Sequence, residues 1–139
     1  MKKNEPRGIR NNNPLNIRRS ADRWRGLREE QTDPDFCQFK SLEWGLRAAF
    51  IILRTYMTKY KLCTVKQLIG RWAPRSENDT ARYIDFVCQK TWLKPNERIK
   101  FWEKNKMCIL VWAMANFECG KEISYGRVEN GYAYINYPR

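Results

Sequence analysis

The longest helical pattern in this chain is SLEWGLRAAFIILRTYMTKY, residues 41–60. Its apolar residues recur every three or four positions, as they do on one face of an α-helix. Ser41 precedes the pattern, and a serine side chain there can accept a hydrogen bond from the free N–H groups of the first turn. We therefore predict a long helix with Ser41 as N-cap, whose buried stripe consists of Leu42, Leu46, Ala49, Phe50, Leu53, Met57 and Tyr60.

Two shorter helices are predicted next. Thr64 and Gln67 have the spacing of a capping box, and Pro74 ends the helix that they begin. Asn78 or Asp79 is placed to cap a third helix. That helix carries the apolar residues Ile84, Val87 and Cys88.

The last third of the chain predicts two more helices and a hairpin. Pro95 fits the first turn of a fourth helix, which carries Ile99 and Trp102. A fifth helix runs from about Lys104 to Gly120, because glycine is a common helix stop. Residues 130–131 are Asn-Gly, the preferred pair of a type I′ turn, so we predict a β-hairpin around them.

Residues 7–40 lack helical periodicity and are rich in Asn, Pro, Gly and Arg. Residues 11–14 and 33–35 predict turns, and the segment between Phe36 and Phe39 can pair as a short strand. The predicted fold class is therefore α+β, mainly α, with about five helices and a small irregular β or loop region. No internal repeat or linker is visible, so we predict a single domain over residues 1–139, flexible over residues 1–6.

Charge and residue usage narrow the function. The net charge of +12 attracts polyanions such as nucleic acid, acidic lipid or an anionic cell-wall polymer. The chain contains no histidine, which excludes His-based triads and most zinc hydrolase schemes. Five cysteines without a Cys-x-x-Cys pair argue against a disulfide framework. We expect no metal and no cofactor.

The first residues are basic but are not followed by an apolar stretch, so they do not predict a signal peptide. No later window approaches the length of a membrane span. We expect a monomer that is synthesised in a reducing cytoplasm and either stays there or leaves by a route other than ordinary secretion.

Glu118 is the most informative carboxylate. It lies four residues after Met114 and seven after Val111, on the apolar stripe of the last predicted helix. Burial there disfavours the charged form and raises the pKa, a property that a glycoside-cleaving general acid needs. The alternative is a helix-end carboxylate that turns out to solvent past Gly120.

Asparagines near the start fit an acetamido-sugar site. Asn12, Asn13 and Asn16 offer amide donors and acceptors beside a proline turn, although asparagine also forms turns for purely local reasons. Glu77 and Asn78 either help to cap the third helix or form a wall of the groove.

Other residues have a simpler explanation beside the functional one. Trp24 and Tyr83 either stack on sugar rings or belong to the core. Glu43 lies in the first turn of the long helix, where the helix dipole accounts for it. The cysteines are most simply small buried hydrophobic residues.

The segment RGIRNNNPLNIR, residues 7–18, resembles the opening motif of phage and prophage lysozyme-like proteins, which are often labelled virion structural proteins. The similarity continues in fixed order through residues 24–26, 36–41, 45–48, 71–74 and 77–84, and so covers roughly residues 7 to 90. Chains of this kind end a late helix with Glu-Asn-Gly, and Glu118-Cys119-Gly120 occupies that place. The resemblance implies a lysozyme-like fold and action on peptidoglycan.

A second resemblance concerns mechanism. Bacterial cell-wall glucosaminidases carry a catalytic Glu near a helix end, followed by an Asn-Leu-Phe-Gly-Ile-Lys segment, a Trp-x-Gly, and a Phe-rich segment that leads into a helix. Residues 13–18, 24–26 and 36–41 are similar to the last three, in the same order. The helix with the Glu does not precede them here. We infer a circularly permuted order, in which Glu118 faces the Asn12–Asn16 segment across a groove.

Two residues depart from the phage pattern. Leu15 stands where that pattern has Gly, and Leu does not readily take positive φ. Cys119 stands where it has Asn, which removes a substrate hydrogen bond. Either change can reduce or abolish activity.

Together these observations predict an enzyme that cleaves the β-1,4 glycan of peptidoglycan, with Glu118 as general acid. No second carboxylate stands out, so the substrate's acetamido group or its 6-hydroxyl attacks the anomeric carbon. The protein then acts at the wall after holin-type release or as a virion component. The alternatives are a basic nucleic-acid-binding or virion protein, and a fold that only binds glycan; weak nonspecific nucleic-acid binding is expected in any case. The substrate-binding residues that we predict are Asn12, Asn13, Asn16, Trp24, Phe39, Glu77, Asn78, Tyr83 and Tyr125.

Overall fold

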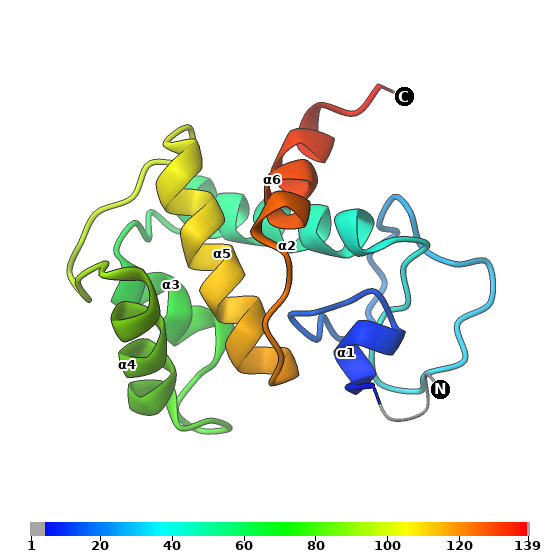
Figure 1. The fold of residues 1–139 in the computed structure, drawn as a ribbon, viewed down its shortest axis with the longest axis horizontal. Coiled ribbons are helices and arrows are strands. Elements are labelled where there is room, and N and C mark those ends of the chain that lie inside the picture. The colour runs from blue at the N-terminus through cyan, green and yellow to red at the C-terminus, as the bar shows by residue number, and fades with distance from the viewer. Residues whose placement is uncertain (1–4, 139) are drawn as a thin grey trace.

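The computed structural model describes residues 5–138 and is mainly helical, as predicted. Residues 1–4, most of the end predicted to be flexible, lie outside the described residues, and Pro6 begins the first helix. Figure 1 shows the helices gathered around α5. Their bounds are α1 Arg7–Arg10, α2 Leu42–Lys59, α3 Val65–Trp72, α4 Thr80–Thr91, α5 Lys104–Cys119 and α6 Tyr125–Ala133, followed by the 3-10 helix η2, Tyr134–Asn136.

Four of the five predicted helices are confirmed, together with their caps. The Ser41 hydroxyl accepts from the Trp44 N–H at the start of α2. Thr64 and Gln67 form the predicted capping box of α3. Of the two candidate caps for α4, Asp79 serves, since its carboxylate accepts from the Arg82 N–H. Gly120 ends α5 in the left-handed conformation, with φ 69°.

The core lies between α2 and α5. Helix α5 is buried around most of its circumference, with Met107, Leu110, Val111 and Met114 fully covered. Helix α2 buries one stripe, which includes Leu46, Phe50 and Leu53. Because α5 contacts α4 on one side and α6 on another, and lies across α2, its C-terminal end is held in place by several neighbours.

The hairpin predicted around Asn130-Gly131 is wrong, because these residues lie inside α6. A type I′ turn needs positive φ at both positions, and neither residue has it. Gly131 is required for another reason. A Cβ on it would lie 2.6 Å from the Leu46 Cβ, so the missing side chain lets α6 pack closely on α2. This tertiary contact overrides the local turn preference.

The fourth predicted helix, with Pro95 in its first turn, is also wrong. Residues 92–103 form an irregular loop instead. The Ile99 N–H donates to the Cys63 carbonyl at 2.8 Å, and Arg98 forms an isolated bridge with Thr64. Pairing with the segment before α3 therefore replaces the local hydrogen bonds of a helix.

Residues 11–40 are loops with isolated bridges, among them Arg18 with Phe36 and Leu27 with Phe39. The small β region is therefore reduced to single pairs within the described chain. The buried carboxylate of Asp33 holds the loops together, because the Asn11 amide and the Arg7 guanidinium both donate to it. A Cβ on Gly45 would lie 2.0 Å from the Asn12 carbonyl oxygen, so this glycine lets the N-terminal loop rest on α2.

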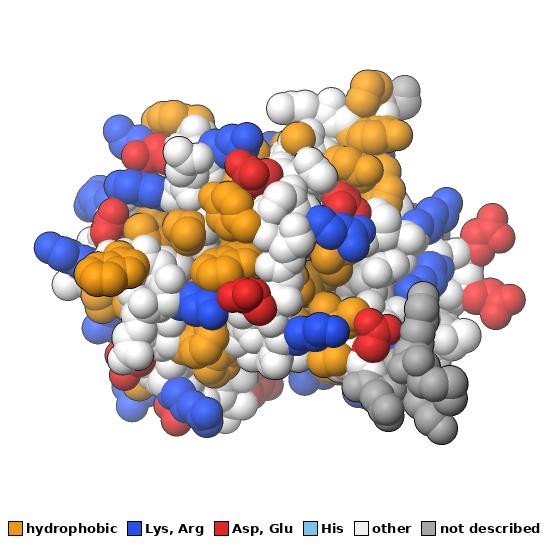
Figure 2. Space-filling view, viewed as in Figure 1, with side chains coloured by type: hydrophobic (Ala, Val, Ile, Leu, Met, Phe, Trp, Pro, Cys, Tyr) orange, Lys and Arg blue, Asp and Glu red, His pale blue; other side chains and the backbone are white. Residues whose placement is uncertain are grey.

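The surface is rich in lysine and arginine, and Figure 2 shows blue side chains spread over the viewed face. All five cysteines are unpaired. Within residues 5–138, no helix is both long and apolar enough to cross a membrane.

Candidate functional site

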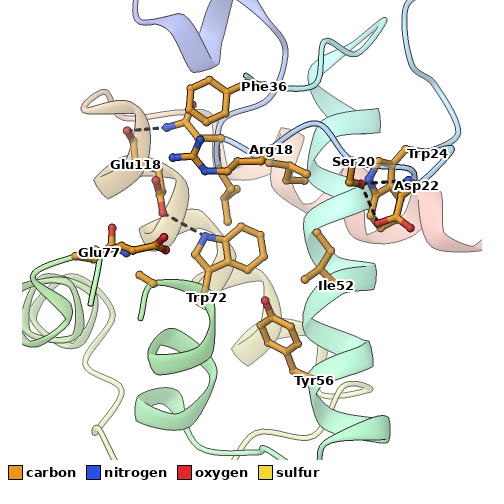
Figure 3. A pocket seen from close by; sticks show the side chains of 15 residues that line it. Arg18, Ser20, Asp22, Trp24, Phe36, Ile52, Tyr56, Trp72, Glu77 and Glu118 are labelled. Atoms are coloured by element: carbon orange, nitrogen blue, oxygen red, sulfur yellow. Dashed lines mark hydrogen bonds between the residues drawn. The ribbon is translucent and has the colours of Figure 1, made fainter. Parts of the chain in front are cut away.

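An open pocket of about 450 Å³ lies between the N-terminal loops, α2, α3 and the C-terminal end of α5 (Figure 3). Glu118 lies in its wall. The other side chains that give the pocket its character are aromatic or charged: Arg18, Asp22, Trp24, Phe36, Tyr56, Trp72 and Glu77. Segments far apart in the sequence thus share one concave surface.

Two donors fix one oxygen of the Glu118 carboxyl. The Trp72 Nε1–H donates to Oε2 at 3.2 Å, and the Tyr83 hydroxyl donates to the same oxygen at 2.9 Å. Trp72 ends α3 and Tyr83 lies in α4, so two neighbouring helices orient the acid. Neither of these two donors contacts the other oxygen, Oε1. The Asn16 side chain, whose amide donates to the Glu118 backbone carbonyl, also lies close enough to favour the charged carboxyl.

Burial raises the pKa of Glu118 above the ordinary value of 4.5, against the opposing effect of its hydrogen bonds. The hydrogen bonds favour the charged form, so desolvation is the larger influence. Burial beside this carboxylate also raises the pKa of Tyr83 well above 10.0, so the tyrosine remains a proton donor in the hydrogen bond. The carboxyl therefore stays protonated to a higher pH than an exposed glutamate does.

The two donors also decide where that proton lies. An indole N–H can only donate, and it already points at Oε2. A proton on Oε2 would face the indole hydrogen, so the acid form places its proton on Oε1. Since neither Trp72 nor Tyr83 occupies Oε1, the proton there is available to a molecule in the pocket.

The predicted asparagines divide into one pocket residue and two loop residues. Asn16 lines the pocket, and its amide donates to the Glu118 carbonyl at 3.3 Å. Asn13 is fully buried, with its amide donating to the Ile17 and Cys37 carbonyls. The Asn12 amide donates to the Phe39 carbonyl. Asn12 and Asn13 therefore shape the loop and do not line the pocket.

The structure brings Trp24, Glu77 and Asn78 to the pocket wall, and Tyr83 reaches the site through its hydroxyl. Phe39 is fully buried in the core and does not line the pocket. Tyr125, on α6, packs edge-to-face on Trp112 and also lies outside it. In the Phe36–Ser41 segment, alternation brings Phe36 to the pocket instead of Phe39.

Sequence reasoning missed several lining residues, above all Trp72, Tyr56 and Arg18. Tyr56 lies within the predicted long helix but outside its predicted buried stripe, and Trp72 lies within the second predicted helix and the phage-like segment 71–74. Neither is predicted to line a pocket, although both carry a polar group on an aromatic ring. The sequence feature that could have identified Trp72 as a pocket residue is its position at the end of a helix, where the indole can turn toward a neighbouring element. No local pattern marks Arg18, whose guanidinium lies over the Phe36 ring, 5.2 Å from its centroid.

The two departures from the phage pattern do not alter the pocket as expected. Positive φ is found at Asn12 and Asn16, not at Leu15, which is a buried residue of the pocket wall. The Cys119 thiol is buried and donates to the Lys121 carbonyl. It does not line the pocket. Within residues 5–138, no three His, Cys, Asp or Glu side chains are grouped so as to hold a metal ion.

Fold and pocket together define a small, mainly helical protein with a half-buried carboxylic acid in the wall of an open groove. No family model matches the chain. Protein P5 of Pseudoalteromonas phage PM2 is 39% identical to it over 132 residues, which are 92% of this chain and 81% of the phage protein. The chain belongs to the family of this phage protein. The expected relationship to bacteriophage proteins is thereby confirmed.

Proposed function

We propose that this protein cleaves the β-1,4 glycan strands of peptidoglycan, with Glu118 as the general acid. The observation that carries the proposal is the state of the Glu118 carboxyl in the pocket wall: Trp72 and Tyr83 hold Oε2, and neither of them occupies Oε1. A general acid that protonates a leaving oxygen needs a raised pKa, as Glu118 has. It also needs its proton on a carboxyl oxygen that other side chains do not occupy.

The reaction begins with transfer of the Glu118 proton to the glycosidic oxygen as the C1–O bond breaks. In a transglycosylase, the 6-hydroxyl oxygen bonds to C1 and its proton passes to the Glu118 carboxylate. In a hydrolase, the acetamido oxygen attacks C1, and water opens the resulting ring and returns a proton to Glu118. Both schemes need only one acidic residue from the protein.

The pocket walls suit a sugar chain. Trp24, Phe36 and Tyr56 offer aromatic surfaces, and the amides of Asn16 and Asn78 offer donors and acceptors. The wall also carries charges of both signs: the Arg18 guanidinium can pair with a carboxylate of the lactyl or peptide groups of peptidoglycan, and Asp22 and Glu77 can accept hydrogen bonds from sugar hydroxyls.

The test is Glu118→Gln, measured as release of muropeptides from purified sacculi. Gln keeps the size and can still accept from Trp72 and Tyr83, but it has no proton to transfer. We expect activity to fall by about 10²-fold or more while the fold is kept. Glu122→Gln, outside the pocket, is the matched control and should keep full activity. Full activity in Glu118→Gln removes this residue from the mechanism.

A second candidate is a non-catalytic virion component that uses its basic surface. The relationship to a phage protein and the net charge of +12 favour it. Such a protein binds polyanions without changing sacculi, so the same sacculus assay separates the two candidates.

A further inference from the structure

The loop from Trp92 to Glu103 presents two exposed tryptophans at one edge of the molecule. Trp92 is 91% exposed and Trp102 is 74% exposed, whereas the other large exposed hydrophobic residues, Tyr60 and Tyr137, are at most 47% exposed. The loop joins α4 to α5 and forms the left edge in Figure 1. An indole this exposed contributes little hydrophobic stabilisation to the fold. A role at the surface is therefore needed to explain why tryptophan occupies these two positions.

Three cations lie between the tryptophans: Lys94, Arg98 and Lys100, all exposed. Among the described residues none of them forms an ion pair, and the Lys100 ammonium lies 5.7 Å from the Trp102 ring centroid. We call these five residues the tryptophan–lysine surface. Figure 2 shows hydrophobic and basic side chains side by side along this edge.

The two acidic residues of the same loop share one cation, Lys106. Lys106, in the first turn of α5, lies 3.1 Å from a Glu97 carboxylate oxygen and 3.8 Å from one of Glu103. The loop therefore presents an excess of positive charge to the solvent. The neighbouring exposed residues Lys61 and Lys66 add to it.

The loop is held firmly in this arrangement. Leu93 and Ile99 are buried on its inner side. Hydrogen bonds from Val65 and Lys66 to the Glu97 and Pro95 carbonyls tie it to α3. Trp92 has φ 66°, a left-handed conformation that is rare for a bulky residue and that a glycine would adopt more readily. A tryptophan at a position that favours glycine indicates that its side chain has a role at the surface.

We propose that the tryptophan–lysine surface docks the protein on a bilayer that contains anionic lipid. Tryptophan prefers the headgroup region of a membrane, where its ring meets apolar chains and its N–H meets water. Lysine and arginine beside it are attracted to anionic headgroups. None of the five residues lines the Glu118 pocket, and their loop lies at the outer edge of the molecule, which fits a broad surface better than a single polymer strand.

This docking is independent of the proposed cleavage. Glu103, at the end of the loop, and Glu118 lie 15 residues apart, at opposite ends of α5. At about 1.5 Å per residue, the two sites are separated by roughly 22 Å along the helix. Substitutions in the loop therefore leave the pocket intact, and loss of either function is measured without the other.

The experiment is cosedimentation of the full chain with vesicles of phosphatidylcholine alone or mixed with phosphatidylglycerol. We expect binding only to the mixed vesicles, with a blue shift of tryptophan fluorescence. The double variant Trp92→Gly, Trp102→Ser should lose the shift and most of the binding; Gly suits the backbone at position 92. The triple variant Lys94→Ser, Arg98→Ser, Lys100→Ser should bind on the order of a hundredfold more weakly, roughly fivefold per cation.

The matched control removes three exposed cations elsewhere, Arg10→Ser, Arg23→Ser and Lys40→Ser, and should bind nearly as tightly as the unchanged protein. Equal losses in the two triple variants would mean that only net charge matters, which overturns the proposal. Equal binding to both kinds of vesicle, or unchanged binding in the tryptophan variant, also overturns it. So does an absence of vesicle binding with tight binding of single-stranded DNA that requires the two tryptophans.

Discussion

The side-chain amide of Asn16 donates a hydrogen bond to the backbone carbonyl of Glu118 at 3.3 Å, although 102 residues separate the two in the sequence. The Glu118 carbonyl lies in the last turn of α5, where it has no helical partner. Asn16 therefore fills a vacant acceptor at a helix end and fixes the N-terminal loop beside the acid. The pocket depends on this contact between the two ends of the chain.

The raised pKa of Glu118 predicts a pH dependence of stability. Because the folded state holds the proton more tightly than the unfolded state, the resulting stability is fully present below about pH 4.5 and is lost as pH rises through the folded pKa. Glu118→Gln has no such loss. We expect its Tm to improve relative to the unchanged protein between about pH 4 and pH 7 in thermal melts. A constant Tm difference across that range would show that the Glu118 pKa is unshifted.

Tyr83→Phe should lower glycan cleavage and move its pH profile. The hydroxyl favours the charged form of Glu118, so its removal raises the pKa of the acid further. The alkaline limb of kcat/KM should therefore move to higher pH, and kcat should fall by up to about 10²-fold as the carboxyl loses one of its two fixing contacts.

Tyr125→Phe provides the control for this change, since Tyr125 lies outside the pocket. We expect its rates and pH profile to match those of the unchanged protein. An equal effect in both variants would mean that Tyr83 does not act through Glu118.

Gly131→Ala should destabilise the fold, because the new Cβ would lie 2.6 Å from the Leu46 Cβ and force α6 away from α2. Overpacking of this kind costs about 1–3 kcal/mol. Gly70→Ala is the matched control variant, since Gly70 also lies in a helix but a Cβ on it would have no atom within 4 Å. That change should stabilise by about 0.5–1 kcal/mol. Urea unfolding of both variants measures the difference, and similar signs would contradict the packing argument.

Salt separates glycan cleavage from nucleic-acid binding. A chain of +12 should bind DNA weakly at low salt, and that affinity should fall by orders of magnitude between about 50 and 200 mM salt. Cleavage of uncharged chitooligosaccharides rests on hydrogen bonds and aromatic contacts and should fall far less. Tight, sequence-selective DNA binding at about 200 mM, without any glycan interaction, would favour the non-catalytic candidate.

Local signals in the sequence predicted the helices well where caps and periodicity agreed, as at Ser41, Thr64, Asp79 and Gly120. They failed at Gly131 and around Pro95, where contacts with α2 and with the segment before α3 decide the conformation. A turn preference or a proline position is weaker than such tertiary packing.

The residues of the candidate site were likewise predicted where a local pattern marks them and missed where a tertiary contact decides their role. Glu118 was found from its place on an apolar stripe, and burial does raise its pKa. Trp72 was missed as a partner because its contact with the acid is set by the angle between α3 and α5, which no local pattern records. The Asn13 amide was assigned to substrate, but it is fully used by the Ile17 and Cys37 carbonyls.

The 102-residue separation between Asn16 and Glu118 has a consequence during translation. The ribosome completes the N-terminal loops, α2, α3 and α4 before it adds the residue that carries the acid. A nascent or prematurely ended chain therefore contains most of the pocket wall but no proton donor. The pocket thus acquires its acid only after the other residues that line it have been synthesised.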